Sequence, residues 1–450
     1  MNSLVGPADR RPAGGIGAAV AAANERARRS LLRGHGGGHA PVSNIELFFD
    51  LVFVFAITQL SHTLHHHLSW LGLTENVVLF LAVWWGWIYT AWVTNWVNPD
   101  RGPVRILLLA LMLVALALAA ALPDAFAAGG PVFAGLYLAF QLGRSITMCV
   151  LFRGEDAARM RNMARIAAWF LFAAPLWIAG ALAEHDLRLG LWLAALAIEY
   201  AGPMTMFQTP GLGRSTVADW DISGSHMAER CSLFIIIALG EGIVVTGSSF
   251  ADQPMTSGRI TAFVIAFLSA ALMWWLYFDL GAQRGARLIS GHEQAGRVAR
   301  NAYTYLHMPI VLGVVIGAVG DALLLETPSG TAPRELVLIQ TGSALLFLGG
   351  VGLFKRYANT FANFPMSHIV AIVLFLVLGA AGWWASVPAT HFAGYGISIL
   401  LLTCVWEWVS YHGGWMERME KLGIPGMAAM RARSETRLAA RMEKLGQTRL

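Results

Sequence analysis

The chain has 450 residues, of which 56% are hydrophobic and only 13% are charged. A soluble domain usually contains about 25% charged residues, so the charged fraction here is about half the usual value. Apolar residues fall in blocks of about 20, the length that a helix needs to cross a bilayer core. Despite the formal net charge of +5, these features exclude a soluble enzyme, a nucleic-acid-binding domain and a disulfide scaffold. The sequence predicts an all-α polytopic membrane protein.

The chain begins with a segment rich in Ala, Gly and Arg at 1–42, which predicts a disordered cytoplasmic arm without a removable signal peptide. About twelve membrane-spanning helices are then expected, in a first six-helix half at 43–208 and a second at 226–412. A cytoplasmic linker is expected at 209–225. The segment 413–450 predicts amphipathic helices at the inner headgroups or a solvated basic tail. The predicted spans are 46–66, 75–97, 104–123, 131–152, 165–183, 188–208, 226–249, 259–280, 302–325, 335–354, 366–386 and 392–412.

Lys and Arg residues are concentrated in the N-terminal arm, in the tail and in the loops that follow even-numbered spans. Cytoplasmic loops of membrane proteins carry an excess of Lys and Arg. The distribution therefore predicts that both termini lie in the cytoplasm, which agrees with an even number of spans.

The two halves also share features in a common order, which predicts a six-plus-six internal repeat. An even number of spans in each half keeps both halves in the same orientation, and parallel repeats of this kind recur in transporters. The matching features are the apolar runs that open at Glu46 and Glu229, the pairs Trp84-Trp85 and Trp274-Trp275, and the pairs Asp124-Ala125 and Asp321-Ala322.

Ionisable side chains inside the predicted spans are candidate site residues, because each costs about 2.5–3.5 kcal/mol at the centre of a membrane helix. Most of them fall in the cytoplasmic half, which predicts a polar cavity or a proton relay there. The alternative is structural, with Glu229 paired to Arg230 or Arg144 and Asp50 capping a helix or docking a loop. The ion- or substrate-binding candidates are Asp50, Arg144, Glu199, His226, Glu229, Arg230, Glu241, Tyr277, Asp279 and His307.

Whether the functional or the structural interpretation is favoured differs between residues. For Glu46, Glu229 and Arg230, which lie near a membrane surface, the structural interpretation is favoured. For Glu241, a functional role is favoured, because it lies near the middle of an apolar span without an obvious partner.

Metal and cofactor chemistry finds little support in the sequence. His62, His65 and His66 have a spacing that can hold Zn²⁺ on one helical face, but an interfacial His cluster is the favoured interpretation. We therefore expect neither a resident metal nor a cofactor. The chain has no nucleophile elbow, P-loop or HExxH motif. No catalytic residue is assigned, and whether the protein is an enzyme stays open.

Four segments resemble the sequence blocks of the bacterial low-temperature-requirement A family. ELFFDLVFVFAITQLSH (46–62) and SGSHMAERCSLFIIIALGEGI (223–243) are similar to its two hallmark segments, and WWLYFDL (274–280) and YLHMPIVLGVVIGAVG (305–320) to later blocks. The resemblance covers roughly 43–412. It implies a multispan bacterial inner-membrane protein required for growth in the cold, but no biochemical activity. The matching positions are Glu46, Phe49, Asp50, His226, Glu229, Arg230, Gly240, Glu241, Tyr277, Asp279, His307 and Pro309.

Two functions follow as hypotheses from different classes. The first is a secondary-transporter-like permease that binds a coupling proton at Glu241 and Asp50, with an unknown small molecule or ion as substrate. The alternative is a membrane-embedded enzyme or lipid-handling protein at the cytoplasmic leaflet, where basic loops could hold anionic head groups. A purely structural role is weaker. The expected partners are membrane lipids and the substrate, without nucleic acid, and the oligomeric state stays open.

Overall fold

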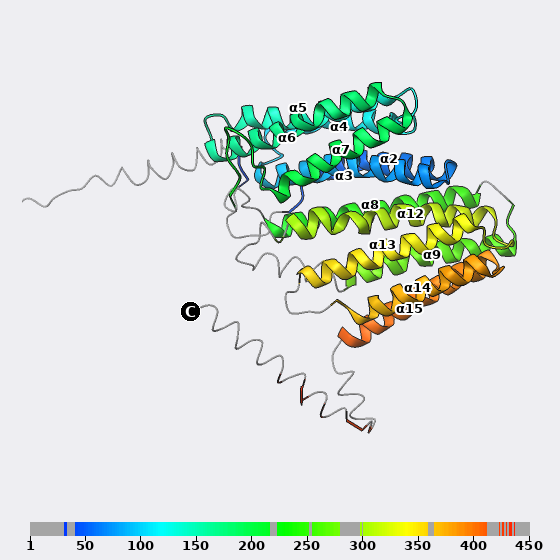
Figure 1. The fold of residues 1–450 in the computed structure, drawn as a ribbon. Coiled ribbons are helices and arrows are strands. Elements are labelled where there is room, and N and C mark those ends of the chain that lie inside the picture. The colour runs from blue at the N-terminus through cyan, green and yellow to red at the C-terminus, as the bar shows by residue number, and fades with distance from the viewer. Residues whose placement is uncertain are drawn as a thin grey trace, which may run out of the picture. The chain divides into compact units, whose positions relative to one another are not determined.

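The computed structural model describes residues 31–33, 41–216, 223–251, 254–279, 298, 300–358 and 364–411, and seven single residues between 423 and 436. Within this part of the chain the regular structure is helical, with twelve α-helices, one π-helical turn and no β-strand (Figure 1). Eleven helical segments are long and apolar enough to cross a membrane. The prediction of an all-α polytopic membrane protein is confirmed. The expected arm and tail lie mostly outside the described residues.

The first of two compact units contains the described residues up to Leu60 and those from Thr74 to Arg230. It holds most of α2 and α3, all of α4 to α7, and the first turns of α8. Helix α5 packs against α4 and α6, and α6 packs against α7. The bounds are α2 Asn44–His66, α3 Trp70–Trp96, α4 Gly102–Ala120, α5 Gly130–Phe152, α6 Ala157–Leu182, α7 His185–Met204 and α8 Gly224–Ala251.

The second unit contains residues 61–73 and the described residues from Cys231 onward, apart from the stretch 293–297. It holds the end of α2, the start of α3 and the rest of α8, followed by five α-helices and the π-helical turn η3. Helix α12 packs against α13 and α9, while α15 packs against α9 and α14. The bounds are α9 Ser257–Tyr277, η3 Arg300–Tyr305, α12 His307–Glu326, α13 Arg334–Ala358, α14 Met366–Trp384 and α15 Ala389–Tyr411.

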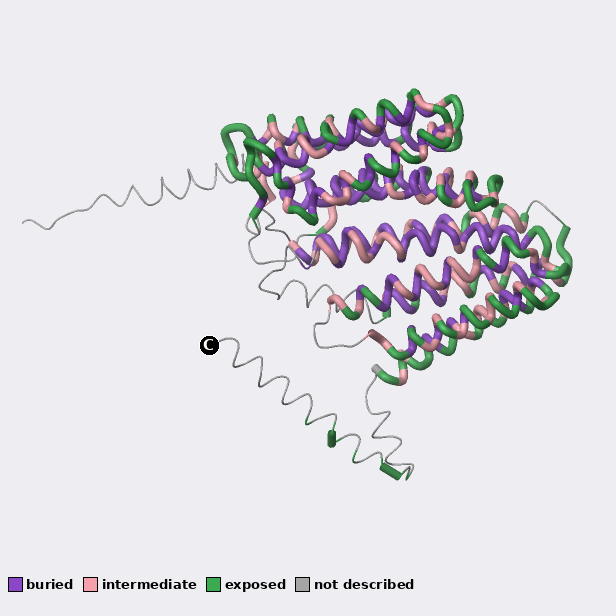
Figure 2. The backbone as a smooth tube through the Cα atoms, in the orientation of Figure 1, coloured by how far each residue is buried: buried purple, intermediate pink, exposed green. Residues whose placement is uncertain are grey.

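Burial separates central helices from peripheral ones within each unit. In the first unit, 89% of the apolar window of α3 is buried, and its Trp84, Trp85 and Trp87 side chains are almost fully enclosed. In the second unit, 72% of the window that contains α12 is buried, against 28% for α14 (Figure 2). Apolar side chains that stay exposed on a helix of this length are those expected to face lipid.

Helix α7, which corresponds to the sixth predicted span at 188–208, is not among the eleven segments that qualify as membrane spans. Its 20 residues include Asp186, Arg188 and Glu199, which lower its hydropathy. Its membrane crossing therefore stays a prediction. Arg188, the first residue of the predicted span 188–208, lies in the first turn of α7. It is buried, and its guanidinium donates hydrogen bonds to the backbone oxygens of Gly180 and Ala125.

Helix α6 begins eight residues before its predicted start at 165, because Asp156 caps it. The Asp156 carboxylate accepts hydrogen bonds from the N–H groups of Ala158 and Arg159. Such a cap satisfies donors that the first helical turn leaves without partners. The predicted spans left 153–164 as a loop, and this is wrong for residues 157–164, which form the first turns of α6.

The features that predicted an internal repeat lie in unlike surroundings. Trp84 is buried, whereas the matched Trp274 is half exposed. Asp124 is exposed, whereas the matched Asp321 is buried. The repeat, the two predicted halves with their boundaries and the cytoplasmic position of both termini stay predictions.

Candidate functional site

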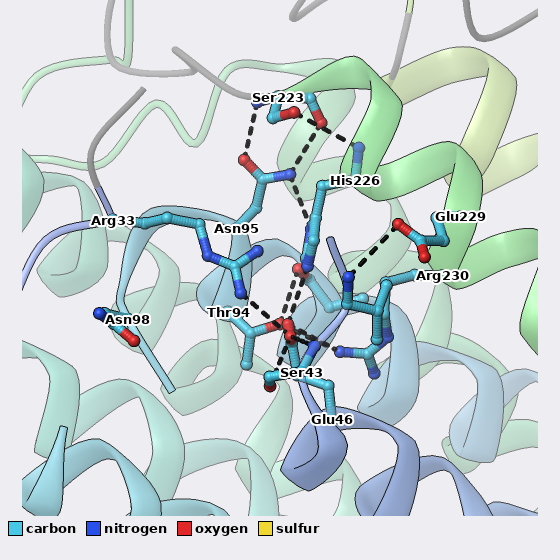
Figure 3. A network of polar contacts seen from close by, with 12 residues as sticks. Arg33, Ser43, Glu46, Thr94, Asn95, Asn98, Ser223, His226, Glu229 and Arg230 are labelled. Atoms are coloured by element: carbon cyan, nitrogen blue, oxygen red, sulfur yellow. Dashed lines mark hydrogen bonds and ion pairs between the residues drawn. The ribbon is translucent and has the colours of Figure 1, made fainter. Parts of the chain in front are cut away.

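Four ionisable side chains from α2 and α8 meet inside the first unit, and we call them the α2–α8 cluster. They are Glu46 and Asp50 on α2 and His226 and Arg230 on α8, and each side chain is 0% exposed. Figure 3 shows Glu46, His226 and Arg230 of this cluster. Each pair is separated by four residues, the spacing that places two side chains on one face of a helix. Arg230 Nη2 lies 2.6 Å from Asp50 Oδ1, and Arg230 Nη1 lies 3.3 Å from Glu46 Oε1.

Glu46 has a second role at the start of α2. Its Oε2 accepts hydrogen bonds from the backbone N–H and the hydroxyl of Ser43, each at 2.8 Å, and from Arg33 Nη2 at 3.0 Å. Ser43 and Glu46 have the S-x-x-E spacing of a capping box, in which the glutamate satisfies the N–H at the helix start. The same carboxylate therefore begins the helix and binds a residue of the N-terminal arm to it.

The hydrogen bonds around His226 determine its tautomer. Asn95 Oδ1 accepts from the backbone N–H of Ser223, so Asn95 Nδ2 is the atom that donates to His226 Nδ1, at 3.1 Å. Because Nδ1 accepts, the ring is neutral and carries its hydrogen on Nε2. That N–H donates to Glu46 Oε1 at 2.9 Å. Asn95 thus orients the imidazole toward the carboxylate (Figure 3).

Asp50 uses only one of its two oxygens. Oδ1 accepts from Arg230 Nη2 and, at 2.7 Å, from the indole N–H of Trp87. Oδ2 is buried and makes no hydrogen bond to any residue that the structure describes. Arg230 also donates to Thr94 Oγ1 at 3.1 Å and lies over the Trp87 ring. Asp50 Oδ2 is therefore the atom of the cluster that has an acceptor position left for a proton.

The α2–α8 cluster together with Arg33 is balanced in charge when His226 is neutral. The carboxylates of Glu46 and Asp50 stand against the guanidinium groups of Arg230 and Arg33. Buried ions are tolerated when they are paired and hydrogen-bonded, and removing one partner is strongly destabilising. One added proton would leave one positive charge without a counterion.

Glu229 lies beside this cluster but is not part of it. The side chain is half-buried, and its Oε2 accepts a hydrogen bond from the backbone N–H of Val42 at 3.3 Å (Figure 3). The alternative in which Glu229 pairs with Arg230 is wrong for the described contacts, because Arg230 binds Asp50 and Glu46 instead. Glu229 attaches the segment before α2 to α8.

Two other candidates of the first unit are joined by a chain of hydrogen bonds. Arg144 donates to the side chain of Gln141, Gln141 donates to Tyr137, and the Tyr137 hydroxyl donates to Glu199. Trp177 donates a further hydrogen bond to Glu199 at 2.8 Å. The sequence indicated Arg144 and Glu199 separately but not the chain that joins them.

The candidates of the second unit form a smaller polar contact. His307 Nδ1 lies 2.8 Å from the Ala302 oxygen, which can only accept, so Nδ1 carries the hydrogen. In the neutral ring, Nε2 then accepts from the Tyr277 hydroxyl at 2.8 Å. Asp279 is exposed and accepts from the Trp275 indole N–H. Glu241 is buried in the part of α8 that belongs to this unit.

The predicted His cluster at the end of α2 does not close around one point. His62 Nε2 contacts His66 Nε2 at 3.1 Å, whereas His65 pairs with Glu326 at 3.2 Å. Across the described ranges of the chain, no group of three or more His, Cys, Asp or Glu side chains is arranged to hold a metal.

Several residues of these networks were missed in the sequence. Arg33, Thr94 and Asn95 make hydrogen bonds to residues of the α2–α8 cluster, and their signal was weak, since single polar residues in an arm or an aromatic helix have no pattern. In the second unit, Lys355 Nζ binds Glu407, which also contacts His368 Nδ1 at 3.1 Å.

Comparisons with known proteins show which family the chain resembles. Residues 41–405 match the family model described as bacterial low temperature requirement A protein (LtrA). A protein of Rhizobium meliloti (strain 1021), described as uncharacterized, is 40% identical over 369 residues, which is 81% of this chain and 88% of that protein. No solved structure matches the chain significantly.

Proposed function

Since the chain belongs to the bacterial low temperature requirement A family and is an integral membrane protein, we propose that it is a secondary-transporter-like permease of the bacterial inner membrane. A proton on an intramembrane carboxylate would drive the movement of an unidentified substrate. The observation that carries the proposal is Asp50, a fully buried carboxylate that has one oxygen bound to Arg230 and Trp87 and the other without a hydrogen bond to the described residues.

The proposed coupling step is the protonation of Asp50 at Oδ2. A proton there removes the negative charge that holds Arg230 Nη2 at 2.6 Å. A neutral carboxyl binds a guanidinium more weakly than a carboxylate does, because the attraction between two opposite charges is lost. Arg230 keeps Glu46 as a partner, at 3.3 Å. Loading and unloading the proton would therefore move Arg230 between its two carboxylate partners.

The position of the α2–α8 cluster within its helices supports this proposal. Glu46 and Asp50 lie in the first two turns of α2, His226 and Arg230 in the first two turns of α8, and Asn95 at the end of α3. With the predicted orientation, these ends face the cytoplasm, so a proton could reach the cluster from that side. Glu241 lies in the part of α8 that belongs to the second unit and stays a separate candidate for a protonatable carboxylate.

The test is substrate-evoked current from proteoliposomes on a solid-supported membrane. Wild type, Asp50→Asn and Glu241→Gln would be challenged with ions, amines, sugars and antibiotics under a proton gradient. Asp124→Asn is the matched control, because Asp124 is an exposed aspartate outside the spans. We expect a current in wild type and in the control that is lost in Asp50→Asn. Equal currents in all inserted variants, or none in wild type, would contradict the proposal.

The alternative of an enzyme or lipid-handling protein at the cytoplasmic leaflet has weaker support. It relied on the predicted cytoplasmic clustering of groups able to act on a head group, namely His226, Glu229, Arg230, Asp279 and His307. Both ring nitrogens of His226 and of His307 are engaged in hydrogen bonds. Lipid analysis of a deletion strain complemented with wild type or His307→Ala would distinguish the alternatives, since a lipid change that only wild type restores would favour lipid chemistry.

A further inference from the structure

A small cavity in the second unit contains a carboxyl group that the α2–α8 cluster does not involve. The cavity has a volume of about 40 Å³ and lies between α9, α12, α13, α14 and α15. A second cavity of about 20 Å³ adjoins it on the side of α8 and shares Ser269, Met273, Gly317 and Asp321 with it. Asp321, Ser269, Gln340 and Ser343 contribute the polar side chains of the lining.

Asp321 is the charged member of this lining. Its exposed fraction is 9%, and it makes no hydrogen bond or ion pair with any residue of the described ranges. An ionised carboxylate that is removed from water needs a counter-charge, or it takes up a proton and becomes neutral. No basic side chain contributes to the lining of either cavity. The charge of Asp321 must therefore be neutralised by a bound cation or by a proton that the carboxylate takes up.

The size and chemistry of the cavity limit what that ion can be. A volume of about 40 Å³ holds a few water molecules or one hydrated ion, whereas pockets for organic ligands measure about 300–1,000 Å³. Carboxylate, amide and hydroxyl oxygens are ligands that suit hard cations. A single carboxylate balances one positive charge, which favours a monovalent cation over a divalent one.

The glycines of α12 keep this space open. A Cβ atom added at Gly317 would lie 2.8 Å from Ser343 Oγ. That hydroxyl donates to the Gly313 oxygen at 2.7 Å, so its lone pairs stay available to accept or to coordinate. A larger residue at position 317 would displace an oxygen of the lining.

We propose that Asp321, with Ser269, Gln340 and Ser343, forms a binding site for a monovalent cation, either Na⁺ or a proton. The site belongs to the second unit and is independent of Asp50. The proposal for this site does not depend on whether Asp50 couples transport, so an experiment can refute the proposed function without refuting the site, and the reverse.

Other titratable groups on the surrounding helices do not line the cavity. On α8, Glu241 precedes Gly242, which lines the second, smaller cavity. Glu326 on α12 pairs with His65, and Arg259 on α9 donates to the Ser249 oxygen. On α13, α14 and α15, the titratable side chains near the other helix ends include Lys355, His368 and Glu407, which bind one another.

Two measurements on the purified full-length protein distinguish the two cations. The first is thermal unfolding in NaCl, in KCl and in choline chloride at equal ionic strength. The second is infrared spectroscopy of the protonated carboxyl band as a function of pH. The variants are Asp321→Asn, Gln340→Leu, which keeps the carboxylate and removes an amide ligand, and the exposed control Asp124→Asn.

A Na⁺-specific rise in the unfolding temperature that Asp321→Asn abolishes, Gln340→Leu reduces and Asp124→Asn retains would support Na⁺ binding. A carboxyl band that titrates with pH and is absent from Asp321→Asn, without a Na⁺ effect, would support the proton. The proposal is overturned if wild type shows neither response, or if Asp321→Asn keeps the response of wild type. If Asp321→Asn does not fold, the size of the Na⁺ effect on the unfolding temperature of Gln340→Leu tests Na⁺ binding. A carboxyl band that titrates in protein with isotope-labelled aspartate then tests proton binding.

Discussion

Replacing Arg230 by Gln removes the guanidinium that connects the two carboxylates of the α2–α8 cluster. The variant loses the contacts to Asp50 at 2.6 Å, to Glu46 at 3.3 Å and to Thr94 at 3.1 Å. The two carboxylates are affected differently. Glu46 keeps Arg33, Ser43 and His226, whereas Asp50 keeps only the indole N–H of Trp87.

Removing one partner of a buried ion pair costs about 3–5 kcal/mol, because it leaves a buried charge without compensation. We therefore expect Arg230→Gln to lower the free energy of unfolding by about that amount. Most of the loss comes from Asp50, so adding Asp50→Asn should restore part of it. Residues in one ion-pair network show interaction energies of about 0.5–3 kcal/mol. We expect the double variant to be at least about 1 kcal/mol more stable than the sum of the two single changes predicts.

The assay is unfolding of the detergent-solubilised protein with sodium dodecyl sulfate, followed by tryptophan fluorescence. Trp87 contacts both Asp50 and Arg230, so the signal includes a reporter inside the cluster. The reasoning would be refuted if Arg230→Gln stayed within about 1 kcal/mol of wild type, or if the two changes were simply additive.

Two further predictions concern local structure. Partial burial raises the pKa of Asp156, but hydrogen bonds and charge from Arg159 outweigh it and hold that pKa below its ordinary value. Asp156→Ala should therefore cost about 1 kcal/mol near neutral pH. The loss should shrink as the pH falls below about 4, the ordinary pKa of aspartate, and should disappear below the lowered pKa of Asp156, where wild type also loses the charged cap. A pH-independent difference between the two unfolding curves would argue against this origin. Gly313→Ala would place a Cβ atom 2.7 Å from the backbone nitrogen of Phe347, which should destabilise the α12–α13 packing by about 1–3 kcal/mol. Gly349→Ala, with nothing within 4 Å, is the control, and equal thermal stability of the two variants would contradict the argument.

Membership in the low temperature requirement A family and the all-helical membrane fold were predictable from the sequence. Long apolar runs indicate the membrane helices, and motif residues such as Glu46 and His226 indicate the family, without knowledge of the tertiary structure. The start of α6 was not predictable in the same way, because three arginines in its first turns have the composition of a loop. The Asp156 cap and the helix propensity of the neighbouring alanines make this segment helical.

The members of the candidate site were predictable, but most of their partners were not. Residues four apart on one helix, such as Glu46 and Asp50, share a face whatever the tertiary structure is. Which helix meets that face depends on packing, so neither the pairing with Arg230 nor the role of Asn95 has a local signal. Asp321 was noted only as part of a repeat, since one aspartate near a helix end does not indicate a cavity.

The central claim is that Asp50 binds the proton that couples transport. The most direct measurement is the internal pH of proteoliposomes with a trapped dye, after addition of a substrate that evokes a current. The account predicts a substrate-dependent pH change in wild type and in Asp124→Asn, and no pH change in Asp50→Asn. A pH change of the same size in Asp50→Asn, or substrate movement in wild type without any pH change, would contradict it.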